Sequence, residues 1–460
     1  MRLMATRLVN IDRATAMFLP CDLREWLPAD HIVHFILEAV EQLPLGTFAD
    51  NARGTGSEQY PPGMMVALLI YCYATGRTGS RTIEAATHSD VAVRYLCANT
   101  HPDHATICQF RTENEAAFKA AFVRVLELAH ELKLTAVGTV SVDGTKVAAN
   151  ASKHAAVSYA RAGEMLAQLE LEVQELLSQA KAADNQPREE GLKVAAELAR
   201  RQSRQAALKQ ARAVIEERAR ERARAEREAF ERQQEERRRR EAQGRKIGGR
   251  KPEPPTAEPQ PSDQYNFTDP ESRIMKAGSG AHYEQAYNAQ LAVDPHLLIV
   301  GQRVCASPND KEELGATVAA IEPVVQGEVQ AVLADSGFYS EAAVAAVEQS
   351  GQRTVYAAVS KDSHHRSLAQ ILAPCEPAPL PPGATPLERM RHRLATRVGR
   401  ELYRLRKQTV EPVFGIIKEV MGFRRFRLRG RQKASLEWLL VCLSYNLRRL
   451  FVLRRQAVAG

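Results

Sequence analysis

Three acidic side chains lie where a carboxylate could take part in chemistry. Asp143 follows the alternating apolar residues of segment 138–142, and Asp335 follows the apolar run 329–334. Each acid precedes a small-residue turn, as expected at the end of a strand. If the two strands are neighbours, the carboxylates meet at one edge of a sheet and repel each other unless a cation joins them. Oxygen ligands of this kind suit Mg²⁺ or Mn²⁺.

A third carboxylate is expected from a helix, and Glu411 is the candidate. It lies in the apolar stretch 410–417, so we expect it to face the interior. Lys407 and Lys418 lie four residues before it and seven after it, on or near the same helical face. They could hold a phosphate while the acid holds metal. Taken singly, each acid is also explained as a turn residue or a surface ion pair.

Arginines interleaved with apolar residues follow this helix. They are Arg424, Arg425, Arg427, Arg429 and Arg431. We predict that they bind the phosphate backbone of DNA; an amphipathic edge in solvent is the alternative. The formal net charge of +8 over 460 residues favours an anionic partner, either nucleic acid or a membrane surface.

Composition excludes several other classes of protein. The seven cysteines form no CxxC pair, so we expect neither a zinc site nor a disulfide framework. No apolar run is long enough to span a bilayer, and the first residues lack the apolar core of a signal peptide. We therefore expect a soluble cytoplasmic protein without membrane partners.

The region 20–135 reads as a compact helical domain. Apolar residues recur at helical spacing, and the run 64–74 is bounded by Pro61-Pro62 and Gly76. Arg81 and Arg111, near helix starts, could belong to a helix-turn-helix that reads DNA. A plain helical bundle with solvated arginines explains them equally well, and both interpretations remain open.

The region 155–245 is rich in Ala, Arg, Glu and Gln. Leucines and Val173 recur at a spacing of three and four residues near 166–176, Pro187 breaks the pattern, and a second helix is predicted over 189–240. An antiparallel helical hairpin and a dimeric coiled coil both fit. A Pro-rich linker follows at 248–263.

The rest of the chain alternates strands and helices. The strands are predicted at 138–150, 286–294, 297–305, 329–337 and 354–360. The second and third form a hairpin around Pro295-His296, and helices separate the later ones. This order predicts a mixed α/β sheet. A Pro-rich loop is expected at 364–386, followed by helices to the end of the chain.

Several long motifs occur in the order known from one protein family. They read YPPGMMVALLIYCYATGRTGSRTIE, VSVDGTKVAANASKH, QYNFTDPESRIMK, VLADSGFYS and RKQTVEPVFGIIKEVMGFRRFRLRG. The chain resembles the DDE transposases of bacterial insertion sequences, specifically the group called eleven-eighty-two. The resemblance covers most of the chain outside the helical insertion and the Pro-rich loops. Asp269 and Arg273 belong to the third motif, where a turn with an ion pair is the structural alternative.

The resemblance implies an α/β, ribonuclease H-like catalytic core with Asp143, Asp335 and Glu411 as catalytic, metal-binding acids. It also implies two Mg²⁺ or Mn²⁺ ions per active site. In the superfamily's Tyr, Arg, Glu, Lys signature, Lys418 fits the spacing, Lys407 stands where Arg is usual, and Tyr403 is one residue out of register.

The implied partner is double-stranded DNA, both the terminal inverted repeats of the element and the target, held by a homodimer near the nucleoid. The predicted parts are a helical, DNA-binding domain (1–135), the first core strand (136–154), the insertion with its linker (155–263) and the remaining core (264–460). A catalytically inactive descendant that binds element ends and represses is the alternative function. A coiled-coil scaffold would rest on residues 160–245 alone, and the sheet motifs argue against it.

Overall fold

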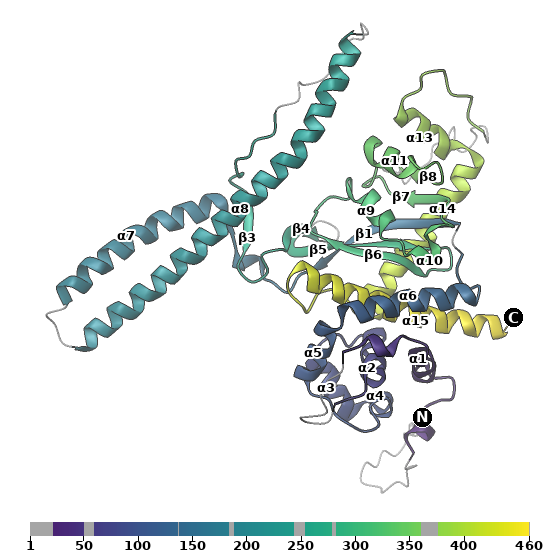
Figure 1. Cartoon of the computed structure of the whole chain (residues 1–460), viewed down its shortest axis with the longest axis horizontal. Helices are drawn as coiled ribbons and strands as arrows, with labels where there is room; N and C mark the ends of the chain where they lie inside the picture. The colour runs from purple at the N-terminus through teal and green to yellow at the C-terminus, as the bar shows by residue number, and fades with distance from the viewer. Residues whose placement is uncertain are drawn as a thin grey trace, which may run out of the picture. The chain divides into compact units, whose positions relative to one another are not determined.

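The computed structural model describes residues 22–49, 59–136, 138–183, 188–242, 254–277, 282–359 and 376–459. Two compact units make up the chain (Figure 1). A helical unit comprises Met1–Thr135, Ile416–Gly422 and Leu439–Gly460, and an α/β unit comprises Ala136–Gly415 and Phe423–Trp438. The four-part division stays a prediction, and these units group the residues differently at the C-terminal end.

The helical unit is built around α2 (Pro62–Ala74), whose residues from Met65 onward are all buried. The helix begins at a proline, which needs no intrahelical donor there. Within the described part of the chain, no helix is both long enough and apolar enough to cross a membrane. The other helices of this unit are α1 (Ile32–Glu41), α3 (Ser80–Ser89), α4 (Val91–Leu96), α5 (His104–Glu113), α6 (Glu115–Glu131) and the C-terminal part of α15 (Arg431–Ala459).

The α/β unit contains a mixed sheet, as predicted. Its strand order is β4-β5-β1-β7-β8, with β6 also paired to β5. The central strand β1 is antiparallel to β5 and parallel to β7, and β7 is parallel to β8. This arrangement is consistent with a ribonuclease H-like core. The strands are β1 (Thr139–Ala148), β4 (Arg273–Ala277), β5 (His282–Val293), β6 (Ile299–Cys305), β7 (Ala331–Ala334) and β8 (Thr354–Ala357).

The predicted hairpin of β5 and β6 is confirmed, whereas β4 was not predicted. Part of the predicted Pro-rich loop, residues 364–375, lies outside the described residues. The helices of the core are α9 (Glu313–Ala319), α10 (Pro323–Gln326), α11 (Glu341–Glu348), α13 (Pro386–Ala395) and α14 (Arg397–Gly415).

The helix α14 packs against β1. Thr409 Oγ1 donates a hydrogen bond of 2.7 Å to Ser141 Oγ in the buried interface. The residues on its buried face are Gly399, Arg406, Thr409, Val410, Val413 and Phe414. Their spacing of three and four residues is that of one helical face, so the apolar stripe fixes how α14 is rotated over the sheet.

Gly399 allows the chain to turn sharply from α13 into α14. A Cβ at this position would collide with the backbone carbonyl oxygen of Arg393 and would lie 3.0 Å from Thr396 Oγ1. Gly399→Ala is expected to destabilise the protein by about 3 kcal/mol, because backbone must shift to relieve the overlap. Urea unfolding measures the loss. Gly415→Ala is the matched control, since nothing lies within 4 Å of its Cβ position, and a comparable loss there would contradict the steric explanation.

The insertion between β1 and the rest of the sheet forms a helical hairpin. It begins and ends at an antiparallel pair, β2 (Ala156–Ser158) and β3 (Gln264–Asn266). Figure 1 shows α7 (Tyr159–Ala183) running alongside the first part of the longer α8 (Arg188–Ala242). The helices share a core made of Val157, Ala162, Leu166, Leu169, Leu208, Ala211, Ile215 and Tyr265. The apolar face between α7 and α8 is therefore packed within one chain, as a helical hairpin predicts. Pro187 lies outside the described residues.

Candidate active site

The pairing of β1 with β7 sets Asp143 and Asp335 level on neighbouring strands. The strands are parallel, and Ser141 lies opposite Leu333. Two residues further along each chain come Asp143 and Asp335, which therefore project on the same side of the sheet. As predicted, Asp335 is the first residue after its strand, and its Oδ1 accepts a hydrogen bond of 2.8 Å from the Gly337 amide.

The position of Asp143 differs from the expectation. This residue lies in the middle of β1 rather than at its end, because β5 continues to pair with β1 as far as Ala148. Its side chain is only 19% exposed. Burial raises the pKa of Asp143 to about 7, and the charge of Asp335 acts in the same direction. The pair of acids therefore favours a cation, as two neighbouring carboxylates should.

A positive charge is already present in the form of Arg406. Its Nη1 donates to Asp143 Oδ2 at 3.3 Å, and its Nη2 donates to Glu411 Oε1 at 3.1 Å. Burial acts to lower the pKa of Arg406, but nearby negative charge, first that of Asp143 and also that of Glu411 and Asp335, raises it overall. Arg406 thus joins Asp143 to Glu411, and the charge of Asp335 also acts on its guanidinium.

The expectation that Glu411 faces the interior is wrong. Its side chain is 50% exposed, because Val410 and Val413 occupy the buried face of α14 and Glu411 lies at the border of that face. The carboxylate therefore reaches Arg406 from the side of the helix and stays accessible to solvent. This position suits a group that must meet a ligand from outside.

Arg406 is a site residue that the sequence analysis missed. Lys407 is exposed on α14, whereas Arg406 is buried. The available signal was its spacing of four and seven residues before Val410 and Val413, which places it on the apolar face. Lys418 lies in the π-helical turn Ile416–Val420, which groups with the helical unit.

Exposed arginines and buried apolar residues alternate in the basic stretch after α14, as the sequence indicates. Arg424, Arg425, Arg427 and Arg429 are exposed, as is Arg431, while Phe423, Phe426 and Leu428 are buried. Backbone hydrogen bonds join the stretch to the end of β1: the Phe426 amide donates to Ala148 O at 2.8 Å. The buried carboxylate of Glu437 accepts hydrogen bonds from the amides of Arg427 and Leu428 at 2.8 and 3.0 Å. The arginines are thus presented on a fixed backbone.

A basic groove of about 460 Å³ lies beside this stretch, within the α/β unit. Its charged and polar lining includes Lys153, His154, Arg425, Arg429 and Asn150. Arg429 Nε also donates to Asn150 O at 3.2 Å. The groove is concave and carries several cations, so it offers a surface for a phosphate backbone.

Neither interpretation of Arg111 holds, because this residue is exposed neither to DNA nor to solvent. This residue lies in the last turn of α5 and is 2% exposed. Its Nη1 donates to Tyr73 Oη at 2.7 Å and to Thr78 O at 3.0 Å. Its guanidinium therefore forms hydrogen bonds in the interior of the helical unit. Arg81, in the first turn of α3, is exposed.

Asp269 has a structural partner. It is fully buried, and its Oδ1 accepts a hydrogen bond of 2.8 Å from Tyr287 Oη. Arg273 instead donates to the backbone carbonyls of residues 270–272 at 3.0–3.1 Å. The ion pair considered between Asp269 and Arg273 is absent from the described part of the structure.

The donor set at the three acids fits divalent metal ions in its chemistry. All the candidate ligands are carboxylate oxygens, and the site demands positive charge. Among the described residues, no three His, Cys, Asp or Glu side chains are arranged closely enough to hold an ion. Arg406 contacts both Asp143 and Glu411.

Two family models match parts of the chain. Residues 255–447 match the transposase DDE domain, and residues 21–113 match a second transposase domain of unassigned function. No curated protein and no solved structure matches the chain. Between them the two family matches cover more than half of the 460 residues. Members of this family bind DNA and generally use divalent metal ions. The chain belongs to the DDE transposases of bacterial insertion sequences.

Proposed function

We propose that this transposase is active, cleaving DNA at the ends of an insertion sequence and joining the freed ends to target DNA. One observation carries the proposal: Arg406 joins Asp143 to Glu411, and Asp335 lies level with Asp143 on the neighbouring strand. A site that holds one fixed cation among three acids is suited to exchange that charge for metal ions. The eleven-eighty-two group is the proposed position within the family.

The three acids would hold two Mg²⁺ or Mn²⁺ ions, which when bound activate the attacking hydroxyl and stabilise the leaving oxygen of a phosphodiester. Water as the nucleophile gives cleavage, and a DNA 3′-hydroxyl gives strand transfer. The chain itself orients the acids: the register of β1 and β7 sets two of them, and the packing of α14 sets the third. No covalent enzyme intermediate is needed, so no nucleophilic side chain is required.

The proposed DNA contacts follow the basic surface of the α/β unit. Arg425 and Arg429 would hold the phosphate backbone in their groove, together with the neighbouring Arg424 and Arg427. Lys407 and Lys418, and Arg81 in the helical unit, remain proposed contacts. Because transposition pairs two DNA ends, we propose a homodimer on terminal inverted repeats, acting at the nucleoid.

The test is nicking of a supercoiled plasmid that carries the element ends, with Mg²⁺ or Mn²⁺. The full chain is expected to nick, and Asp335→Asn and Glu411→Gln are each expected to lower nicking at least a hundredfold (about 3 kcal/mol of lost transition-state stabilisation) while end binding persists. Nicking that survives both substitutions would refute the assignment of the acids.

The alternative is an inactive descendant that binds element ends and represses. It is favoured by the arrangement of the described acids, since no three of them form a ready metal-binding group. Tight, sequence-specific end binding without nicking in either metal would support this alternative.

A further inference from the structure

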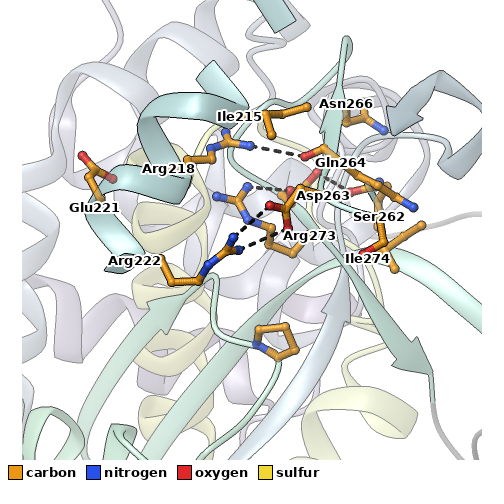
Figure 2. A pocket seen from close by; sticks show the side chains of 13 residues that line it. Ile215, Arg218, Glu221, Arg222, Ser262, Asp263, Gln264, Asn266, Arg273 and Ile274 are labelled. Atoms are coloured by element: carbon orange, nitrogen blue, oxygen red, sulfur yellow. Dashed lines mark hydrogen bonds and ion pairs between the residues drawn. The ribbon is translucent and has the colours of Figure 1, made fainter. Parts of the chain in front are cut away.

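A second basic hollow lies where the insertion helix α8 passes β3 and β4. It has a volume of about 430 Å³. Three arginines line it: Arg218 and Arg222 from α8, and Arg273 from β4. Figure 2 shows the three side chains gathered beside Asp263. We call this hollow the arginine pocket.

The carboxylates that line the arginine pocket do not neutralise all three arginines. Arg222 forms a two-pronged ion pair with Asp263, with hydrogen bonds of 3.2 and 3.0 Å (Figure 2). Arg218 instead donates to Pro270 O at 2.6 Å and to Gln264 O at 3.5 Å. In the described part of the chain, neither Arg218 nor Arg273 has a carboxylate at ion-pair distance, and Glu221 is the other acid lining the pocket.

Burial and the charge of Arg218 disfavour the charged form of Arg273. Burial lowers the pKa of Arg273 to about 10, and the positive charge of Arg218 adds to this effect. Burial also lowers the pKa of Arg218. Each guanidinium has five donors in a planar fork, and carbonyl contacts leave several of them available. An anion entering the pocket would relieve the repulsion and accept these donors.

The remaining lining favours a small oxyanion. It includes hydroxyl and amide groups of Ser262, Ser272, Asn266 and Gln264. An aromatic ring on which a base could stack is absent from this lining. Guanidinium groups match the geometry of phosphate. The other lining groups give no specific contact for a nucleic-acid base.

The arginine pocket adjoins the basic groove of Arg425 and Arg429. Gln285 of β5 lines both hollows, and both lie in the α/β unit. We propose that the arginine pocket binds a backbone phosphate of the DNA that the basic groove holds, so that the base of the insertion extends the DNA-binding surface. This inference rests on the proposed function, which supplies the DNA.

The test substitutes Arg218→Gln and Arg273→Gln, which remove charge but keep a donor for the backbone carbonyls. Binding of element-end DNA is followed by fluorescence anisotropy over a series of NaCl concentrations. The slope of log K against log [NaCl] is negative, and each lost phosphate contact is expected to make it less steep by about 1. Arg224→Gln, an exposed residue on the same helix, is the matched control and should leave the slope unchanged. Arg218→Lys keeps the charge and should retain most of the slope.

Folding of each variant is checked by circular dichroism, so a loss of structure is not mistaken for a lost contact. Unchanged slopes in both folded Gln variants would overturn the proposal and leave the arginines as a structural tie for the insertion. Thermal unfolding with inorganic phosphate alone provides a second arm. If phosphate stabilises the protein only when Arg218 is present, and the DNA slope is unchanged in the variants, the arginine pocket is a site for a free anion. That result would also refute binding of DNA in this pocket. Reduced slopes in a protein that never nicks would reject the catalytic proposal and keep this one.

Discussion

Asp143→Asn is expected to lower plasmid nicking at least a thousandfold while making the metal-free protein more stable at pH 8. The first effect follows because loss of a metal-binding carboxylate forfeits several kcal/mol of transition-state stabilisation (about 4 kcal/mol for a thousandfold). The second follows from burial. A residue placed only for stability would not be expected to combine these opposite effects.

The sign of the stability change comes from the raised pKa. Burial, followed by the charge of Asp335, raises the pKa of Asp143 from 3.8 to about 7. The folded protein therefore holds a proton that the unfolded chain releases near pH 4. The favourable contribution to the free energy of unfolding is complete below about pH 4 and is lost as the pH rises to 7. The total loss between these pH values is at most about 4 kcal/mol.

The asparagine side chain of this variant carries no charge and escapes this loss. Thermal unfolding in EDTA should therefore show a clear gain for Asp143→Asn at pH 8 and a much smaller one at pH 5. Saturating Mg²⁺ should reduce the difference, because it stabilises the ionised wild-type acid. Equal unfolding temperatures for the two proteins at pH 8 without metal would refute the burial argument.

Arg406→Met is expected to destabilise the metal-free protein by about 2 kcal/mol at pH 8 and to increase its stabilisation by Mg²⁺. Breaking a buried ion pair leaves an uncompensated charge, which typically costs 3–5 kcal/mol, or about half of that here because Glu411 is half exposed. With the guanidinium gone, a metal ion no longer competes with a fixed positive charge for Asp143 and Glu411.

Thermal unfolding with increasing Mg²⁺ measures both effects in one experiment. Lys407→Met is the matched control, since it removes the same charge from the neighbouring, exposed position, and it should change neither quantity appreciably. A smaller rise in unfolding temperature with Mg²⁺ for Arg406→Met than for wild type would mean that Arg406 assists metal binding instead of substituting for it.

Local pattern was enough to predict most of the sheet. Alternation and apolar runs predicted β1, β5, β6, β7 and β8 because these strands carry their own signal in sequence. The strand β4 was missed because it exists through its pairing with β5 and carries no clear pattern of its own. The choice between a hairpin and a dimeric coiled coil stayed open because Tyr265, fifty residues beyond the seam residue Ile215, completes the shared core.

The three acids could be predicted from the local pattern and the resemblance, but their surroundings could not be predicted. Arg111 looked like a surface cation because its partners, Tyr73 and Thr78, come from more than thirty residues earlier. The exposure of Glu411 depends on how α14 is rotated, which the stripe of Arg406, Val410 and Val413 decides. The same stripe, which is present in the sequence, marks Arg406 as a residue of the buried face.

The pairing of β2 with β3 has a consequence for how such a protein can diversify. Because Ala156 lies opposite Asn266 and Ser158 opposite Gln264, the long excursion leaves and re-enters the core at adjacent points. Its length is thereby uncoupled from the register that aligns β1 with β7. Lineages could lengthen, trim or exchange this appendage by whole helical turns, adapting to new genomes, while the acids keep their alignment.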